Sequence, residues 1–113
     1  YKEVNDIIRL PYFWEDDVHA YAIDQQVEKD WRVQRYLERS GLKIFDFHPI
    51  HIFLNTDNLK RYSKVRNHLE DTKMLIKHRN MDSSNGTRSF CIKLIKAAKK
   101  QGFKFYKISD IKL

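Results

Sequence analysis

Two segments of the chain repeat one pattern, an amphipathic run that ends at a glycine and is followed by a short apolar run. The first spans residues 31–47 with Gly41 inside it, and the second spans residues 89–108 with Gly102 inside it. Apolar side chains three or four positions apart predict a helix, and a glycine just past the last turn predicts its end. The short apolar runs predict strands. Repeated helix–glycine–strand units predict an α/β fold in which crossover helices join parallel strands, as in a sheet or a barrel.

The rest of the chain adds one strand-like run and several helix-like runs. Ile7–Leu10 is apolar and ends in charged residues around Pro11, which predicts a strand end like the one near Phe45. Asp16 and Asp17 precede a helix-like run, as acidic residues often do at helix N-termini. Helices are predicted at residues 18–27, 57–68 and 70–78, a loop at 80–86, and a cap at Thr87 or Ser89 for the helix that follows.

A length of 113 residues suits one domain at most. The chain begins at Tyr1 and enters a strand-like run almost at once. We therefore expect N-terminal elements of the same domain to precede it. Residues 1–113 would then be the C-terminal half of a single domain, whose hydrophobic layers the missing part completes.

Composition limits the classes of function. The formal net charge is +7 and the pI is near 9.5. The lysines are spread along the chain, and acids such as Asp46, Glu70 and Asp71 lie between them, which favours a solvated basic surface over a nucleic-acid-binding module. No apolar run reaches the roughly eighteen residues that predict a membrane span. The single Cys91 excludes an internal disulfide and fits a buried thiol in a reducing compartment, so we expect a cytoplasmic location.

The segment around Pro49 carries the most reactive side chains. His48 and His51 flank this proline, which is excluded from helix interiors and central strands, so the segment predicts the exit of a strand into a loop. Strand alternation places Asp46 and His48 on one face. A histidine there could act as a general acid or base, because its ordinary pKa of about 6.5 lies close to working pH. It could equally form a structural hydrogen bond in a loop.

The N-terminal acidic motif has two interpretations as well. Asp16 and Asp17 could orient a histidine or bind a cation, or they could simply favour the start of a helix. His19 lies close to them and is a secondary candidate for a role in the same site. Arg9, at the end of an apolar run, should be paired with a carboxylate because its guanidinium is always charged.

Together these motifs resemble the NodB-type polysaccharide deacetylases, carbohydrate esterases with an incomplete (β/α) barrel. Arg9-Leu10-Pro11-Tyr12 is similar to the arginine-x-proline-tyrosine signature of that family. The runs FDFHPIHIFLNT, FWEDD and GTRSF resemble the branch associated with bacterial surface-polysaccharide and O-antigen synthesis. The resemblance covers the chain from Ile7 to about Ile95 and implies that it forms part of such a barrel.

The resemblance also implies a division of the active site. In that family a divalent metal, usually zinc, is held by an aspartate and two histidines upstream of the arginine-x-proline-tyrosine segment, so no metal ligand is expected in this chain. On this chain the resemblance implies that Arg9 tethers the catalytic base and that the backbone N–H of Tyr12 faces the oxyanion. It further implies that His48 protonates the leaving amine, with Asp16 or Asp17 tuning that histidine.

Two departures from the family pattern affect the expected site. Asp46 stands where the family has a leucine two residues before the acid histidine, and FWEDD is longer than the usual acidic motif. They leave open whether His48 or His51 is the acid, and Asp46 becomes a secondary candidate. Trp14 and Phe45 are the candidates for contact with the sugar.

The sequence therefore predicts metal-dependent hydrolysis of N-acetyl groups on a bacterial surface polysaccharide or its sugar precursor. This chain would carry the second half of the active site and would be inactive by itself. Its expected partners are the carbohydrate and the missing N-terminal part of the same domain. Two alternatives stay open, a non-catalytic relative that binds sugar and a small basic nucleic-acid-binding module, which would need clustered lysines and exposed aromatics on one face.

Overall fold

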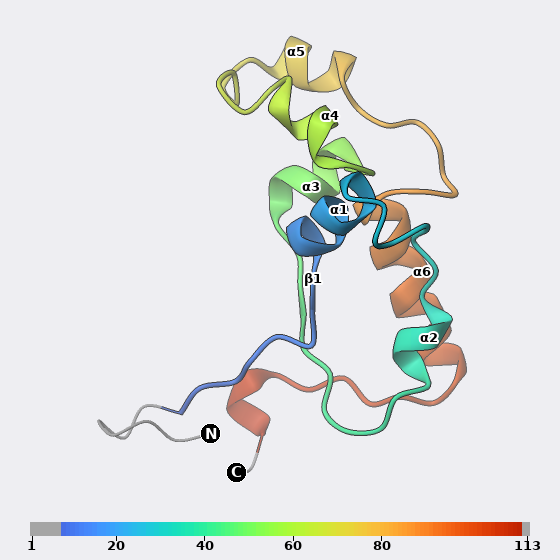
Figure 1. The fold of residues 1–113 in the computed structure, drawn as a ribbon. Helices are drawn as coiled ribbons and strands as arrows, with labels where there is room; N and C mark the ends of the chain where they lie inside the picture. Colours follow the sequence, from blue (N-terminus) through green and yellow to red (C-terminus); the bar gives the residue numbers. More distant parts are fainter. Residues whose placement is uncertain (1–7, 112–113) are drawn as a thin grey trace.

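Figure 1 shows the fold of the computed structural model, which describes residues 8–111. Its sheet is a parallel pair of strands, β1 (Trp14–Glu15) and β2 (Phe45–Asp46). β1 runs directly into the first helix, and a short turn joins β2 to the third. The helices are α1 (Asp16–Asp24), α2 (Gln34–Leu37), α3 (Pro49–Leu54), α4 (Leu59–Ser63), α5 (Thr72–Lys77) and α6 (Thr87–Lys100), followed by a 3₁₀ helix, η1 (Ile108–Asp110).

Side-chain alternation gives the strand pair an aromatic face and an acidic face. Trp14 pairs with Phe45, and Glu15 pairs with Asp46. Residues paired across parallel strands point to the same side, and successive residues point to opposite sides. The rings of Trp14 and Phe45 lie 6.0 Å apart on the core side, so Glu15 and Asp46 face away from the core. The predicted shared face of Asp46 and His48 is thus extended by Glu15.

Helix α6 covers the aromatic face of the strands. Phe90 on α6 is fully buried and stacks on Trp14, with ring centroids 4.3 Å apart and planes 13° from parallel. Aromatic pairs of this kind contribute about 0.5–1.5 kcal/mol beyond their burial. Leu94 and Ala98 on the same face of α6 are also buried, as their spacing predicts. The other buried members of this core are Ala20, Trp31 and Leu37.

The C-terminus of α6 is closed by a Schellman motif. The N–H of Gly102 donates to the carbonyl of Lys99 at 3.2 Å, and that of Phe103 donates to the carbonyl of Ala98 at 3.0 Å. Gly102 has φ 82°, a left-handed conformation in which glycine has no steric penalty. The predicted glycine stop is confirmed.

The N-terminus of α6 is closed by a side chain from elsewhere in the sequence. Oδ1 of Asn55, just past the end of α3, accepts the N–H of Ser89 at 3.1 Å. The prediction that Thr87 or Ser89 caps the helix is therefore wrong, because Gly86 is the cap residue. The hydroxyl of Thr87 instead donates to the carbonyl of Thr56 at 2.9 Å. These bonds fix α6 against the end of α3.

Two predicted strands differ from the structure. Residues 103–108 form no strand, because the chain leaves the α6 cap irregularly and then enters η1. The predicted strand through Leu10 is also wrong. Ile8 makes only an isolated bridge, Ile7 lies outside the described residues, and regular pairing starts at Trp14.

The predicted helices all occur, although most are shorter than expected. The sequence predicts a loop after His48, but the structure has helix α3 there, starting at Pro49. Proline is tolerated in the first helical turn because the N–H that it lacks would have no partner within the helix. Cys91 on α6 is partly buried, and burial raises the pKa of its thiol, in keeping with a structural role.

The parallel pair and its helices confirm the α/β class. Residues 8–111 hold two short strands, so the barrel stays a prediction. Across the same range no helix combines the length and the apolar character that a membrane span needs.

We predict that Gly86→Ala destabilises the protein more than Gly102→Ala. Both positions have positive φ, which costs a residue with a Cβ about 1–2 kcal/mol. At Gly86 the added Cβ would also collide with the carbonyl and side-chain amide of Asn55, whereas at Gly102 it meets open space. Overpacking of this kind costs about a further 1–3 kcal/mol. Urea unfolding of the two variants measures the difference, and equal losses of stability would contradict this account of the Asn55 contact.

Candidate active site

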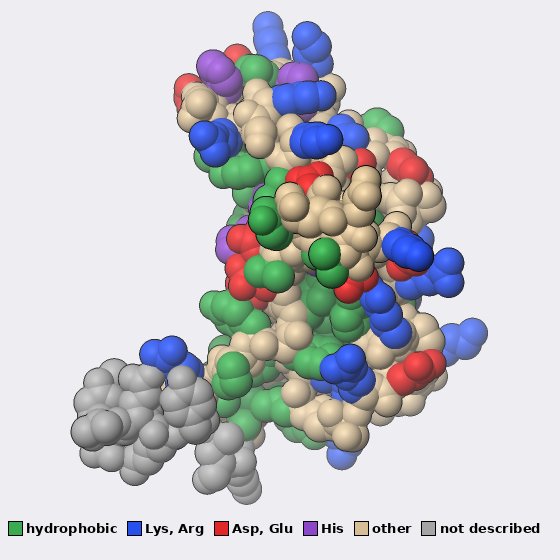
Figure 2. All heavy atoms as spheres, in the orientation of Figure 1, with side chains coloured by type: hydrophobic (Ala, Val, Ile, Leu, Met, Phe, Trp, Pro, Cys, Tyr) green, Lys and Arg blue, Asp and Glu red, His purple; other side chains and the backbone are tan. Residues whose placement is uncertain are grey.

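The candidate site lies at the carboxyl ends of the two strands, where α1 and α3 begin. β1 delivers Glu15, Asp16 and Asp17, and β2 delivers Asp46 and His48. Parallel strands end at the same edge of a sheet, so these two segments meet despite their distance in sequence. Figure 2 shows acidic and histidine side chains gathered at the left of the molecule, at the level of these helix starts.

The carboxylate of Asp16 positions His48 by bonding to both the backbone and the ring of that histidine. The Asp16 side chain is 0% exposed. One of its carboxylate oxygens, Oδ2, accepts the backbone N–H of His48 at 2.7 Å, and Oδ1 lies 2.7 Å from the Nδ1 of His48. Oδ1 also accepts the N–H of Asp17 at 2.7 Å. Nδ1–H of His48 is therefore the donor to Asp16, and Nε2 is left for chemistry.

The environment of His48 favours its protonated form. The hydrogen bond to Asp16 is the main cause of a raised pKa for this imidazole, and the charges of Asp16, Asp46 and Asp17 act in the same direction. Oδ2 of Asp46 lies 3.9 Å from Nε2. The His48 side chain is 41% exposed, so a substrate can reach it. A positioned imidazolium of this kind is suited to donate a proton.

Glu15 is the site residue that sequence reasoning missed. A hydrogen bond to Asp17, followed by partial burial, raises the pKa of Glu15 to about 7. Two carboxyl groups in such proximity hold a proton between them near neutral pH. The signal is an acidic residue directly after the apolar pair Phe13-Trp14, but the strand predicted at Ile7–Leu10 ends before Glu15.

Three of these side chains have donors suited to a cation. One ligand atom each from Glu15, Asp17 and His48 lies within 4.8 Å of the other two. Carboxylate oxygens and an imidazole nitrogen fit a divalent metal such as zinc. The sequence predicts no metal ligand in this chain, and it does not anticipate that these three side chains lie close together. Because Nδ1 of His48 is held by Asp16, only Nε2 could serve, which is the atom that an acid would use.

His51 is less suited than His48 to the role of acid. It is 4% exposed, and its Nδ1 lies 2.8 Å from the hydroxyl of Thr56. Burial lowers the pKa of His51, which favours its neutral form. Its ring packs edge-on against Tyr62 at 5.0 Å. The sequence left open whether His48 or His51 is the acid, and these contacts favour His48.

His19 belongs to the core rather than to the acidic cluster. Its Nδ1 accepts the indole N–H of Trp14 at 3.2 Å, and its Nε2 lies 2.8 Å from the carbonyl of Asp30. Nε2 is therefore the protonated nitrogen of a neutral ring. Burial lowers the pKa of His19, in agreement with that assignment.

The other candidates lie outside the cluster. Trp14 is 7% exposed and stacks in the core, so it has little surface to offer a sugar. Phe45 is half-buried on the same aromatic face. Arg9 and Tyr12 are exposed in the segment before β1, which Figure 1 places at the opposite end of the strands from α1 and α3. Their predicted contacts with a base and an oxyanion stay predictions.

Comparison with known proteins identifies the family. The profile of the family described as "WbmS-like: Polysaccharide deacetylase" matches residues 1–66, more than half of the chain. The chain belongs to the WbmS-like polysaccharide deacetylases. This confirms the resemblance stated from the motifs, and the match includes both segments that build the candidate site. A comparison with curated proteins finds no match.

A solved structure supports the same assignment. The chain is similar to the crystal structure of WbmS from Bordetella bronchiseptica, a proposed polysaccharide deacetylase involved in O-antigen biosynthesis, with 34% identity and a TM-score of 0.67. The match covers 86% of this chain and 38% of that one. This WbmS-like chain thus spans less than half of the neighbour's length.

We predict that Asp16→Asn lowers the pKa of His48, because it removes the charge and the acceptor that stabilise the imidazolium. Asp46→Asn is the matched control and should lower the pKa less, since Asp46 acts on His48 by charge without a hydrogen bond at Nδ1. NMR titration of the His48 ring measures both. An unchanged His48 pKa in Asp16→Asn would refute the positioning role of Asp16.

We predict that His19 makes the protein less stable in mild acid. Burial lowers the pKa of His19 in the folded state, whereas the unfolded chain takes up a proton near pH 6.5. The stability contributed by neutral His19 is therefore complete above that pH and is lost as the pH falls through the folded-state pKa, by at most about 1.4 kcal/mol per pH unit. Urea unfolding at pH 5 and pH 7, followed by tryptophan fluorescence, should show a smaller pH dependence in His19→Gln than in wild type. His68→Gln, which removes an exposed histidine, should match wild type.

Proposed function

We propose that this chain provides the proton-donating half of a deacetylase site that hydrolyses N-acetyl groups on a bacterial surface polysaccharide or its sugar precursor. The observation that carries the proposal is the Asp16–His48 pair at the strand ends of a WbmS-like polysaccharide deacetylase. The description of the neighbour as involved in O-antigen biosynthesis supports the class of substrate.

The proposed role of His48 follows from the needs of amide hydrolysis. Water adds to the acetamide carbon, the C–N bond breaks, and acetate and a free amine are formed. The departing nitrogen needs a proton, which a positioned acid can supply. Nε2–H of the His48 imidazolium would donate that proton while Asp16 holds Nδ1. The neutral imidazole that results keeps its hydrogen bond to Asp16.

A divalent metal, zinc in the family that the chain resembles, would polarise the acetamide carbonyl and lower the pKa of the attacking water. Glu15, Asp17 and His48 have suitable donors for it. However, His48 cannot both bind a metal through Nε2 and donate a proton from the same atom. We therefore assign the metal to residues outside this chain, as the resemblance implies, and propose that the 113 residues alone release no acetate.

The remaining residues would complete the pocket. Arg9 would tether the base, and the backbone N–H of Tyr12 would face the oxyanion. Asp46, beside Nε2 of His48, would favour reprotonation of the acid after each turnover. The single cysteine suits a reducing compartment, so we place the reaction in the cytoplasm.

We predict that His48→Gln lowers kcat for acetate release about 10²–10⁴-fold, the usual contribution of a general acid. The assay uses the full-length protein with zinc and N-acetylated surface sugars. His68→Gln, which changes an exposed histidine elsewhere, should retain activity.

The pH profile adds a second readout to this test. Because the acid is the protonated ring, wild-type activity should fall as the pH rises through the raised pKa of His48. In His48→Gln that decline should be absent from the residual rate. Full activity in His48→Gln would refute the acid role.

The outcome also separates the two alternatives. Sugar binding without metal-dependent acetate release would identify a non-catalytic sugar-binding relative. A nucleic-acid-binding module is less supported, because the face in Figure 2 shows Lys and Arg scattered among acidic side chains rather than gathered in one groove.

A further inference from the structure

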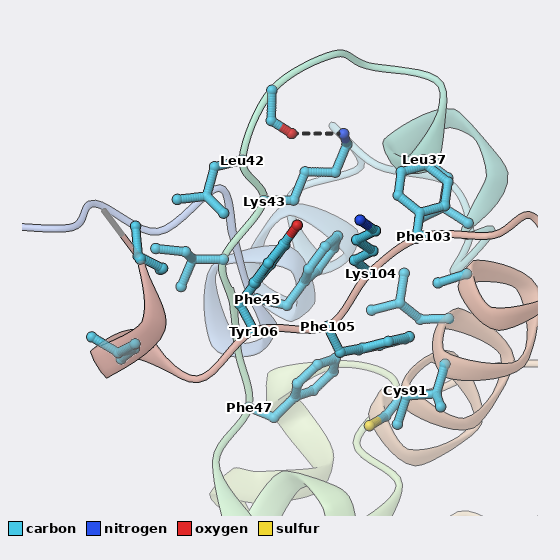
Figure 3. Close-up of a pocket in the computed structure, with 17 residues that line it drawn as sticks. Leu37, Leu42, Lys43, Phe45, Phe47, Cys91, Phe103, Lys104, Phe105 and Tyr106 are labelled. Carbon is cyan, nitrogen blue, oxygen red and sulfur yellow. Dashed lines mark hydrogen bonds between the residues drawn. The ribbon is translucent and has the colours of Figure 1, made fainter. Parts of the chain in front are cut away.

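An apolar groove of about 760 Å³ lies between β2, α6 and residues 103–111. Figure 3 shows the aromatic side chains of residues 45, 47, 103, 105 and 106 gathered in it, with Cys91 of α6 at its edge. Phe45 lines it from the face of β2 opposite Asp46, and Phe47, just after the strand, lines it as well. The groove is therefore distinct from the candidate active site.

The groove leaves large apolar side chains in water. Phe105 and Tyr106 are each 59% exposed, and Ile108 is exposed as well. Scattered exposed apolar residues are normal, but a contiguous aromatic patch along one groove marks a surface that something covers.

The chemistry of the lining favours a polypeptide over a small ligand. Small-molecule pockets place a few polar groups so that they converge on the ligand. Here the ammonium of Lys43 is already bonded to the carbonyl of Gly41 at 3.1 Å and lies 5.4 Å from the centre of the Phe103 ring. Lys104, the other charged residue of the lining, is exposed. The groove thus offers apolar packing surface rather than a set of recognition groups.

The strand pair also lacks neighbours within residues 8–111. Each strand is paired on one side only, and parallel sheets are normally extended by further strands and covered on both faces. The radius of gyration is 15.9 Å, against about 13 Å for a compact domain of this length. A second copy of the chain is a poor occupant, because each copy carries a net charge of +7 and the two would repel.

We propose that the groove is the docking surface for the part of a WbmS-like polypeptide that lies outside the region this chain matches. The match to the neighbour covers 38% of a single longer chain, so a protein of this family has further polypeptide available for that surface. The occupant would pack apolar side chains into the groove and extend the sheet beside β2. This inference rests on the family and the exposed surface, and it does not depend on the proposed deacetylation.

The test is co-expression of this chain, carrying an affinity tag, with the complementary part of Bordetella bronchiseptica WbmS. We expect a 1:1 complex by size-exclusion chromatography with light scattering. Phe105→Asp and, separately, Tyr106→Asp should each weaken the complex about tenfold or more, because a charge replaces a buried aromatic ring. The matched control is Tyr21→Asp on α1, an aromatic that is 56% exposed and lies outside the groove. It should leave the complex intact, and circular dichroism checks that all variants fold.

Three results would overturn the proposal. The first is no complex with the wild-type chain. The second is an equal loss of the complex in Tyr21→Asp. The third is self-association of this chain alone that Phe105→Asp abolishes, because the occupant would then be a second copy. Because the readout is complex formation, a failure here is distinct from a failure to detect acetate release.

Discussion

The buried carboxylate of Asp16 is the constraint on which the candidate site depends. A carboxylate removed from water is costly unless hydrogen bonds replace its hydration. Asp16 obtains them from the backbone of Asp17 and from both the backbone and the ring of His48. One side chain therefore accepts a hydrogen bond from the first turn of α1, links the two strand ends across 32 residues of sequence, and orients the imidazole. Loss of the carboxylate would leave the His48 N–H groups unpaired, so the fold and the proposed acid depend on the same atoms.

Burial separates His19, His48 and His51 into different roles. His19 and His51 are enclosed, each ring is held through Nδ1, and burial lowers the pKa of both. His48 has an acidic partner on one side and solvent on the other, and its pKa is raised. The same residue type thus packs in the core at two positions and can deliver a proton at the third. Sequence proximity to the acids suggested His19 as a candidate, but only the position of each ring in space separates these roles.

Local patterns in the sequence were sufficient for the elements that depend on neighbouring residues. The apolar spacing of α6, its glycine stop and the shared face of Asp46 and His48 are all local properties. The first two are confirmed, and the third agrees with the 3.9 Å between Oδ2 of Asp46 and Nε2 of His48. The errors arose where distant residues decide. Asn55 closes the N-terminus of α6 from outside the helix. Residues 103–108 have the composition of a strand, but they pair with neither β1 nor β2. Strand propensity reflects how well side chains pack on a half-buried sheet. A segment with strand-like composition therefore forms no strand where it does not join a sheet.

The alternation of side chains along two short strands connects the site to the groove. Because Trp14 and Phe45 point toward α6, Glu15 and Asp46 must point the other way. A shift of either strand by one residue would bring carboxylates into the aromatic core and rings into the acidic cluster, so the core itself fixes the register. Any polypeptide that packs into the groove beside Phe45 and Phe47 would stabilise this register without touching the acidic residues. The aromatic face can therefore hold the two strand ends in place while the opposite face stays open to a substrate.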